Sequence, residues 1–215
     1  MRDLSETEFL IITHFQNLVR LWDMYGVEDF IEYSVLVSQV VLGLFLFSVN
    51  FIYLSNRWGA PWVITSPQVI QRMLELAELK PEENLIDLGA GDGRILVSAV
   101  RDFGAEALGV EIDPIRCLLA KFFIRKYGVR GKAKIRWGNM YHTDISGADV
   151  VSIFLTRNTN KRLIPVLEDR LVQGTRIVSY AFPIPGWTPV KIDNTYLIFV
   201  YEMGSTGDDV FTKFV

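Results

Sequence analysis

The sequence has a single cysteine, Cys117, and only two histidines, His14 and His142, among 215 residues. One cysteine excludes an intramolecular disulfide and a cysteine-based metal cluster. The two histidines lie far apart in the sequence, so we expect ordinary polar roles for them and no metal site. Such cysteine usage fits a reducing compartment, although a secreted protein without disulfides would look the same.

The sequence also lacks a strong excess of charge of either sign. Its formal net charge is −3 at pH 7, which is too near neutral to indicate nucleic-acid binding by overall electrostatics. We therefore expect no nucleic-acid partner. Half of the residues are hydrophobic, which is somewhat high for a soluble protein and suggests that part of the chain sits in lipid.

Charged side chains are missing altogether from residues 33–56, a run of 24 residues. A helix needs roughly 20 apolar residues to cross a bilayer, so the run is long enough to span. A cleaved signal peptide fits poorly, because residues 1–32 hold seven acids and two arginines instead of a basic start. We expect a retained transmembrane helix over 33–56. The alternative is a buried soluble helix or an oligomer contact, because Gln39 and Asn50 are among the residues that lower its hydrophobicity.

Residues 1–32 form an N-terminal extension with apolar residues at near-helical spacing between Leu10 and Tyr25. This spacing predicts an amphipathic helix that lies in the membrane interface or packs on a partner protein. Arginines follow the span more than they precede it, which weakly favours a cytoplasmic C-terminal domain. We expect a single-pass protein of a prokaryotic plasma membrane rather than a mitochondrial one, because the acidic start is unlike a transit peptide.

From residue 57 onward, strand and helix patterns alternate. The periodicity and the capping residues predict helices over 66–79, 94–103, 113–128 and 160–171, and strands over 84–88, 107–111, 133–137, 149–154, 175–181, 189–192 and 196–201. Alternation of this kind implies an α/β domain with a parallel sheet and helices on both faces. The last two strands are separated by a short turn, which indicates a closing antiparallel hairpin.

A glycine-rich turn follows the first strand of this domain and reads Asp87-Leu88-Gly89-Ala90-Gly91-Asp92-Gly93-Arg94. Glycines allow a tight turn and a close approach of a ligand to backbone N–H groups. The second strand ends at Glu111, 22 residues after Gly89, where a carboxylate can accept hydrogen bonds from both hydroxyls of a ribose. The two features together predict a cofactor that contains adenosine.

The charges around this turn distinguish between two such cofactors. In a dinucleotide-binding turn the third glycine comes one residue later, where this chain has Arg94. Asp87 and Asp92 would repel a pyrophosphate, whereas they suit the ammonium and sulfonium charges of S-adenosylmethionine. The residues favour S-adenosylmethionine, with a dinucleotide enzyme as the alternative.

The turn resembles motif I of the class I methyltransferases, and residues 109–113 resemble the motif that follows it. Residues 61–67, 138–141, 143–146 and 183–187 are similar to a smaller group, which comprises archaeal protein-lysine methyltransferases and the mitochondrial lysine methyltransferase of the ATP synthase c-subunit. The resemblance covers about residues 60–203. It implies a Rossmann-like, mostly parallel seven-stranded sheet with an antiparallel C-terminal hairpin, in a methyltransferase domain over 57–215.

The resemblance also implies positions for the cofactor and for the methyl acceptor. Glu111 would hold the ribose, residues 139–141 would flank the adenine and Thr65 would lie over the methionine end. Loop, core or capping roles are the alternatives for these positions. The expected cofactor-binding residues are Thr65, Asp87, Gly89, Ala90, Gly91, Asp92, Glu111, Ile112, Asn139, Met140 and Tyr141. The expected acceptor channel is lined by Leu155, Thr156, Asn158 and Trp187.

The implied reaction is methyl transfer from S-adenosylmethionine to a lysine of a protein, which we expect to be a membrane protein or a membrane-proximal partner. The archaeal enzymes have His-Glu ahead of a phenylalanine, where this chain has Tyr180-Ala181 before Phe182. The sequence selects no catalytic base. A methyltransferase for a lipid or another small molecule, and a non-catalytic cofactor-binding module of a membrane complex, are the alternatives.

Overall fold

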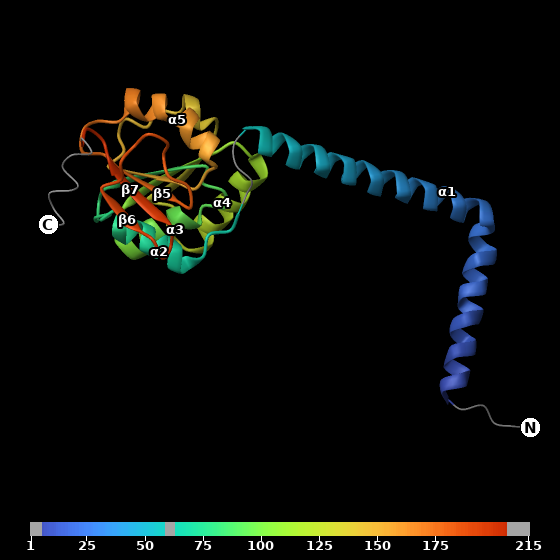
Figure 1. The fold of residues 1–215 in the computed structure, drawn as a ribbon. Coiled ribbons are helices and arrows are strands. Elements are labelled where there is room, and N and C mark those ends of the chain that lie inside the picture. Colours follow the sequence, from blue (N-terminus) through green and yellow to red (C-terminus); the bar gives the residue numbers. More distant parts are fainter. Residues whose placement is uncertain (1–5, 59–62, 206–215) are drawn as a thin grey trace, which may run out of the picture. The chain divides into compact units, whose positions relative to one another are not determined.

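The computed structural model describes residues 6–58 and 63–205, which fall in two compact units, Met1–Tyr53 and Leu54–Val215. The first unit consists of most of one long helix, drawn in blue in Figure 1, and the second contains the sheet.

The first unit is built from α1 (Glu6–Trp58), a helix of 53 residues with a kink at Gly26, where φ is 64° and ψ is 156°. Within α1, Asp29–Phe47 is long and apolar enough to cross a membrane by length and composition alone, with a mean hydropathy of 1.9. This window overlaps the predicted span over residues 33–47. Residues 6–32 are helical, while their placement in an interface stays a prediction.

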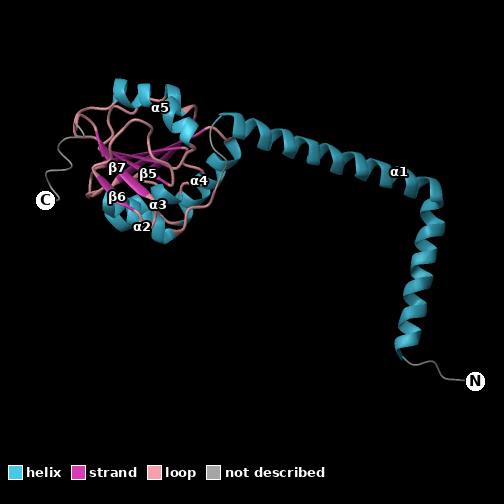
Figure 2. Cartoon of the chain, viewed as in Figure 1, coloured by secondary structure: helices cyan, strands magenta, loops and turns pink. Residues whose placement is uncertain are grey.

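The second unit contains a seven-stranded sheet in the order β3-β2-β1-β4-β5-β7-β6. Figure 2 shows these strands in magenta between layers of helix. The first five strands pair in parallel, and β7 runs antiparallel to both β5 and β6, which confirms the predicted class I methyltransferase sheet. The strands are β1 (Asn84–Leu88), β2 (Glu106–Glu111), β3 (Ala133–Trp137), β4 (Val150–Ile153), β5 (Arg176–Tyr180), β6 (Lys191–Asp193) and β7 (Ile198–Glu202).

Helices cover both faces of this sheet. One core cluster joins the sheet to α2 (Pro67–Leu76), α3 (Arg94–Phe103) and α4 (Pro114–Lys126), and a second cluster joins the opposite face to α5 (Arg157–Arg170). In Figure 1, α5 accordingly lies on the other side of the strands from α2 and α3. Leu85 and Ile86 belong to different clusters because successive strand residues point to opposite faces.

Side-chain caps decide where three of the helices begin. Ser66 accepts a hydrogen bond from the Val69 N–H at 3.4 Å, and Asp113 accepts one from the Ile115 N–H at 2.8 Å, as the cap-and-proline patterns predict. The predicted start of α5 near residue 160 is wrong. Thr156 accepts a hydrogen bond from the Thr159 N–H at 3.3 Å, so α5 begins at Arg157.

The strand order places a switch point between β1 and β4. The chain leaves β1 toward β2 on one side and leaves β4 toward β5 on the other. The connections that follow β1 and β4 therefore diverge at the carboxyl ends of these neighbouring strands. We call this place the crevice, because open α/β sheets bind ligands at such a switch point. The glycine-rich turn and residues 154–156 lie on its two sides.

Candidate active site

The glycine-rich turn needs its glycines for backbone conformation. Gly89, Gly91 and Gly93 have φ values of 87°, 55° and 77°, which side-chain-bearing residues rarely adopt. The N–H groups of Gly89 and Ala90 both donate to the Val110 carbonyl, at 2.9 and 3.1 Å, and so join the turn to the end of β2. The turn is thereby held against the strand that carries Glu111.

Glycine is also needed in β2, underneath the turn. A Cβ atom at Gly109 would lie 2.6 Å from the Ala90 Cβ and 2.7 Å from side-chain atoms of Ile135 and Leu96. On the other side, a Cβ at Gly89 would meet the Leu155 Cδ2 at 3.0 Å. The turn is therefore packed between β2 and the β4–α5 connection with no room for a methyl group at Gly109.

Glu111 lies at the end of β2 and is only 4% exposed. One of its carboxylate oxygens accepts from the Gly91 N–H at 2.8 Å, and the other accepts from the Asp113 N–H at 3.0 Å. Arg116 adds an ion pair at 3.9 Å. Each carboxylate oxygen can accept about two hydrogen bonds, so capacity remains for the two hydroxyls of a ribose.

Asp87, at the carboxyl end of β1, is the most unusual titratable group of the site. It is 2% exposed, and its Oδ1 accepts a hydrogen bond from the Ser152 hydroxyl at 2.7 Å. Its Oδ2 has no partner among the described residues. Burial raises the pKa of Asp87 to about 7 against the opposing effect of Ser152, and the nearby carboxylates Glu111 and Asp92 raise it further. A buried acceptor of this kind suits a cationic ligand group.

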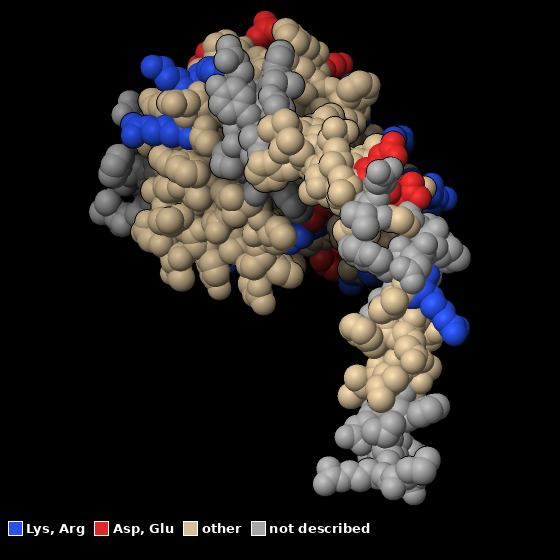
Figure 3. Space-filling model, turned by 90° about the vertical axis from the view of Figure 1, so that its right-hand side faces the viewer, with Lys and Arg blue, Asp and Glu red and all other residues tan. Residues whose placement is uncertain are grey.

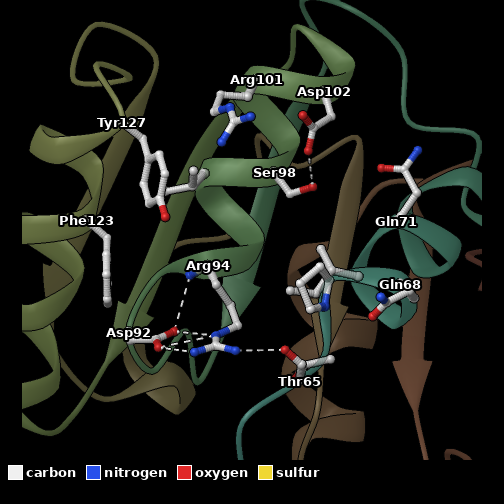
Figure 4. A pocket seen from close by; sticks show the side chains of 13 residues that line it. Thr65, Gln68, Gln71, Asp92, Arg94, Ser98, Arg101, Asp102, Phe123 and Tyr127 are labelled. Atoms are coloured by element: carbon white, nitrogen blue, oxygen red, sulfur yellow. Dashed lines mark hydrogen bonds and ion pairs between the residues drawn. The ribbon is translucent and has the colours of Figure 1, made fainter.

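Asp92 is neutralised within the turn itself. The Arg94 guanidinium donates to both of its oxygens, with Nη2 2.6 Å from Oδ2 and Nε 2.9 Å from Oδ1, and its Nη1 donates to the Thr65 carbonyl at 2.8 Å (Figure 4). The attraction of the cofactor's positive charges by both carboxylates stays a prediction. Arg94 balances the charge of Asp92, whereas no ion pair balances Asp87 among the described residues, and no sequence pattern indicates the Arg94–Asp92 pair.

Thr65 is 5% exposed, and Ser66 rather than Thr65 caps α2. The Arg94 contact to its carbonyl ties the segment before α2 to the glycine turn. This contact keeps Thr65 beside the turn where the methionine end of the cofactor is expected. Its role toward the cofactor stays a prediction.

A cavity of about 600 Å³ lies next to the turn, between α2, α3 and α4. In Figure 4, Asp92, Arg94 and Thr65 lie at one end of this cavity, and Arg101 and Tyr127 lie at the other. The Arg101 guanidinium is 5.3 Å from the centre of the Tyr127 ring. Neither Glu111 nor residues 139–141 line this cavity. It is therefore distinct from the expected adenosine site, but its lining includes Thr65 and Asp92, two residues expected at the methionine end of the cofactor.

The expected adenine loop follows β3. Asn139 accepts a hydrogen bond from the Tyr141 N–H at 3.0 Å and so caps the short 3₁₀ helix η1 (Met140–His142). Met140 is 8% exposed in the core, and Ile112 accepts a hydrogen bond from the Trp137 indole at 2.9 Å. These contacts show that Asn139 and Met140 have structural roles. Adenine contacts by this loop and by Ile112 stay predictions.

Tyr141 also has a polar atom without a partner. Its hydroxyl is buried and has no hydrogen-bond partner in the described part of the chain. The Arg162 guanidinium lies 4.9 Å from the centre of its ring. Burial raises the pKa of Tyr141, and Arg162 partly opposes this effect. The hydroxyl can therefore act as a neutral donor or acceptor toward a ligand.

The four residues expected to line the acceptor channel have different surroundings. Leu155 is 5% exposed and packs against the glycine turn, and Thr156 caps α5. Asn158 is exposed on the first turn of α5. Trp187 packs on Tyr201, with ring centres 6.0 Å apart, in the core cluster beneath α5. The structure thus places the first two residues at the crevice, and a channel formed by all four stays a prediction.

Asn160, which no sequence pattern singles out, is fully buried behind the ends of β4 and β5. Its Nδ2 donates to the Phe182 carbonyl at 3.0 Å and to the Ser179 hydroxyl at 3.4 Å. Its Oδ1 has no partner among the described residues. An amide acceptor left open beside the crevice is a candidate for binding the group to be methylated.

The chain near Asn160 has an uncommon backbone conformation. Ala181 has φ of 63° and Leu197 has φ of 55°, although neither is glycine. The Ala181 N–H donates to the Leu197 carbonyl at 2.8 Å and so joins the two strained residues. Ala181 belongs to the Tyr180-Ala181 pair that replaces His-Glu of the archaeal enzymes. The strain therefore falls where the sequence departs from the archaeal pattern.

Comparison with known proteins agrees with this geometry. The ANTKMT methyltransferase domain family matches residues 87–191. A protein-lysine N-methyltransferase of Saccharolobus islandicus is 42% identical over 151 residues, which are 67% of this chain and 94% of that protein. This chain belongs to that family of methyltransferases. The methyltransferase is also 28% identical to the mouse adenine nucleotide translocase lysine N-methyltransferase, over 72% of this chain and 68% of the mouse protein.

Among solved structures, an RNA methyltransferase of Salinibacter ruber in complex with S-adenosyl-L-homocysteine is similar to the methyltransferase with a TM-score of 0.65. The two are 36% identical, and the match covers 67% of this chain and 95% of that one. The bound molecule is S-adenosylmethionine without its transferred methyl group. S-adenosylmethionine is therefore the methyl donor of this family.

The residues of the site fit this donor. The unpartnered, buried Asp87 Oδ2 suits its ammonium group, Glu111 has acceptor capacity for its ribose, and the turn has no side chain at Gly89 or Gly91 to obstruct close approach. When bound, S-adenosylmethionine supplies a methyl group that is already activated by a positively charged sulfur. The protein must therefore bind, orient and desolvate the two reactants.

Proposed function

We propose that this methyltransferase methylates a lysine side chain of a protein. The observation that carries the proposal is the 42% identity to a protein-lysine N-methyltransferase over 94% of that protein's length. Relatives with the same kind of activity in their names support it, such as the human lysine N-methyltransferase of the ATP synthase c-subunit, at 29% identity. That match covers 54% of the human protein.

The proposed donor site is the β1–β3 half of the crevice. Asp87 binds the ammonium group of the donor, Glu111 binds the ribose, and residues 139–141 and Ile112 flank the adenine. Thr65 and the turn, including Asp92, contact the methionine end.

The proposed acceptor site is the β4–α5 side of the crevice. A lysine ammonium has no lone pair, and its ordinary pKa is about 10.4, so the amine must lose a proton before it can accept a methyl group. Transfer of the amine into a dry crevice lowers its pKa by desolvation, so that its proton is released to bulk water. The open Asn160 Oδ1 then accepts a hydrogen bond from the neutral amine and orients its lone pair, with Leu155 and Thr156 beside it.

The proposed location is a membrane, with α1 as a single-pass anchor through Asp29–Phe47. The donor is made in the cytoplasm, so the catalytic domain lies on that side and the N-terminus on the other. An anchor raises the effective concentration of the enzyme toward substrates at the same membrane. The proposed substrate is therefore a membrane protein or a membrane-proximal protein, and a prokaryotic plasma membrane fits the acidic N-terminus best.

A second candidate function is RNA methylation. It is favoured by the 36% identity to the Salinibacter ruber protein, which is described as an RNA methyltransferase, over 95% of that chain. Both candidates use the same donor site and differ in what enters the acceptor side. An experiment on the acceptor therefore separates them.

The test is to incubate the purified full chain with membranes, with soluble protein and with RNA from the same source, using donor labelled in the methyl group. We expect label in protein, at lysine on peptide mapping, and no label with Glu111→Ala. Label in RNA or lipid alone would reject the lysine assignment. Binding of donor without any labelled product would indicate a non-catalytic module.

A further inference from the structure

The outer face of α4 is hydrophobic, although it faces solvent. The side chains of Ile115, Leu118, Leu119 and Phe122 are 51%, 64%, 39% and 56% exposed. Residues spaced by three and four positions lie on one side of a helix, so these four form a continuous stripe. The opposite side of α4 is buried through Cys117, Ala120 and Ile124. The helix is therefore apolar on both sides, which is typical of a helix with a second partner.

The other helices of the domain do not share this property. The exposed positions of α2, α3 and α5 carry polar or charged side chains and prolines, and none of them is a large hydrophobic residue. α5, which covers the other face of the sheet, exposes Lys161, Arg162, Glu168 and Asp169. The stripe on α4 is therefore a local feature and does not reflect the general composition of the surface.

Trp137 extends the stripe beyond α4. It is the last residue of β3 and is 69% exposed. Its side chain lies on the same face of the strand as those of Ala133 and Ile135, which pack in the core cluster that includes α4. Its indole N–H donates to the Ile112 carbonyl at 2.9 Å, just before α4 begins. The indole is thus fixed beside the stripe with its polar atom satisfied. We call Ile115, Leu118, Leu119, Phe122 and Trp137 together the α4 surface.

Positive charge surrounds the α4 surface. Residues 114–137 contain eight of the 22 Lys and Arg of the chain and no Asp or Glu, although the whole chain is net negative. Lys121, Arg125 and Lys126 are exposed on α4, and within the described residues no carboxylate forms an ion pair with them. Figure 3 shows one face of the molecule, with the Lys and Arg side chains in blue and the uncharged side chains in tan.

We propose that the α4 surface binds the headgroup region of an anionic lipid bilayer. Aliphatic side chains and an indole on one side of a helix, with lysine and arginine beside them, are the features by which helices lie in a membrane interface. Lys121, Arg125 and Lys126 would contact lipid phosphates while the stripe enters the acyl boundary. The inference goes beyond the proposed function, since it does not depend on the methyl acceptor or on α1 crossing the membrane.

Two other occupants fit the α4 surface less well. A second copy packed through the same face would bring Lys121, Arg125 and Lys126 close to their own counterparts, and like charges disfavour such a contact. A nucleic acid would match the charge, but proteins bind its bases with aromatic rings, and the stripe is mainly aliphatic. An anionic bilayer matches the charge and the aliphatic side chains together.

The proposal can be tested with an environment-sensitive fluorophore on the full chain. Cys117 is 3% exposed, so a cysteine introduced by Leu118→Cys can be labelled selectively. The parent protein, treated with the same fluorophore, should take up no label. A label at Glu168→Cys on α5 is the matched control. The labelled proteins are mixed with vesicles of phosphatidylcholine alone or with added phosphatidylglycerol.

We expect the label at position 118 to report an apolar environment only with phosphatidylglycerol vesicles, and the label at position 168 to report water in both. Replacing Lys121, Arg125 and Lys126 by glutamine should weaken this docking about 100-fold, since each cation near an anionic surface contributes on the order of 1 kcal/mol. The melting temperature and donor affinity of the triple variant should match the parent.

Three results would overturn the proposal. The first is a label at position 118 that stays in water with anionic vesicles while the protein is folded and binds donor. The second is a lipid-independent, concentration-dependent signal, which would show that a second copy covers the stripe. The third is a response to single-stranded RNA but not to vesicles, which would assign the charges to nucleic acid. Loss of lysine methylation with retained docking would affect only the proposed function.

Discussion

The two halves of the crevice differ in how their backbone is held. On the β1–β3 half, Glu111 accepts hydrogen bonds from the Gly91 and Asp113 N–H groups, and the turn amides are bonded to β2. On the β4–β5 half, Asn160 has an open acceptor, and Ala181 and Leu197 hold uncommon backbone conformations. The first half is held in place by hydrogen bonds to its backbone amides, and the second combines an open acceptor with uncommon backbone conformations.

The ligands that we propose for the two halves account for this difference. The donor is one molecule with fixed charges and hydroxyls, so its half can be bonded in advance, and the buried Asp87 Oδ2 and Tyr141 hydroxyl are left open for it. The acceptor changes among relatives, whose names include a translocase, a component of ATP synthase and RNA. Unsatisfied groups and strain are expected where a variable partner completes the site.

The most damaging single change should be Glu111→Ala in the donor half. It removes acceptors for the ribose and leaves the buried Gly91 and Asp113 N–H groups without partners, so donor affinity should fall on the order of 100-fold or more. Glu106→Ala, at the exposed start of the same strand, should change affinity little. Calorimetry with S-adenosylmethionine measures both.

Glu111→Gln, which keeps one acceptor oxygen, is the control for loss of binding through unfolding. It should melt close to the parent temperature and bind donor with an intermediate affinity. Unchanged donor affinity in a folded Glu111→Ala protein would remove the ribose assignment and, with it, the idea that this half is preformed for the donor.

The next effect should be a pH dependence of donor binding through Asp87. Its pKa is about 7 in the folded protein against an ordinary value of 3.8, and only the ionised form attracts the donor's ammonium group. Donor affinity should therefore fall up to about tenfold for each pH unit below 7. Asp87→Asn should bind weakly and flatten the profile, and an unchanged slope in this variant would assign the titration elsewhere.

The same shift has the opposite sign for the stability of the free protein. Between pH 3.8 and about 7 the folded state binds the Asp87 proton more tightly than the unfolded state does. The contribution of Asp87 to stability is therefore lost as pH rises through this window and is constant above it. Thermal unfolding of the parent and of Asp87→Asn, compared across this range without donor, checks the sign.

A smaller effect, on stability, should follow from Gly109→Ala. The new methyl group would meet Ala90, Leu96 and Ile135 at 2.6–2.7 Å, and overpacking of this kind destabilises by roughly 1–3 kcal/mol. Gly131→Ala is the matched control, because its Cβ would have nothing within 4 Å and its φ is not positive. Denaturant unfolding should separate the two, and equal stabilities would show that the turn can shift away from β2.

The two halves also differ in how far the sequence predicts them. The glycine turn and Glu111 are joined by short-range geometry, because a strand, a tight turn and a fixed spacing determine where they meet. The partner of Asp92 could not be predicted, since Arg94 reaches back to it only in the folded turn. Asn160 is still less visible, because its surroundings come from α5 and from residues 19–22 positions later in the chain.

The substitution with the smallest expected effect tests the division of the crevice into two halves most directly. Asn160→Ala removes the open acceptor beside the crevice, together with the hydrogen bonds that its Nδ2 donates to Phe182 and Ser179. Loss of the one hydrogen bond to the acceptor should lower turnover roughly threefold to tenfold, while donor affinity stays at the parent value. Lys161→Ala, at the exposed neighbouring position of α5, distinguishes an effect of the buried amide from a general effect on α5. Single-turnover rates with saturating donor, set beside calorimetric donor affinities, provide the comparison. If Asn160→Ala weakened donor binding as much as turnover, Asn160 would belong to the donor half, and the division of the crevice into a donor side and an acceptor side would fail at that residue.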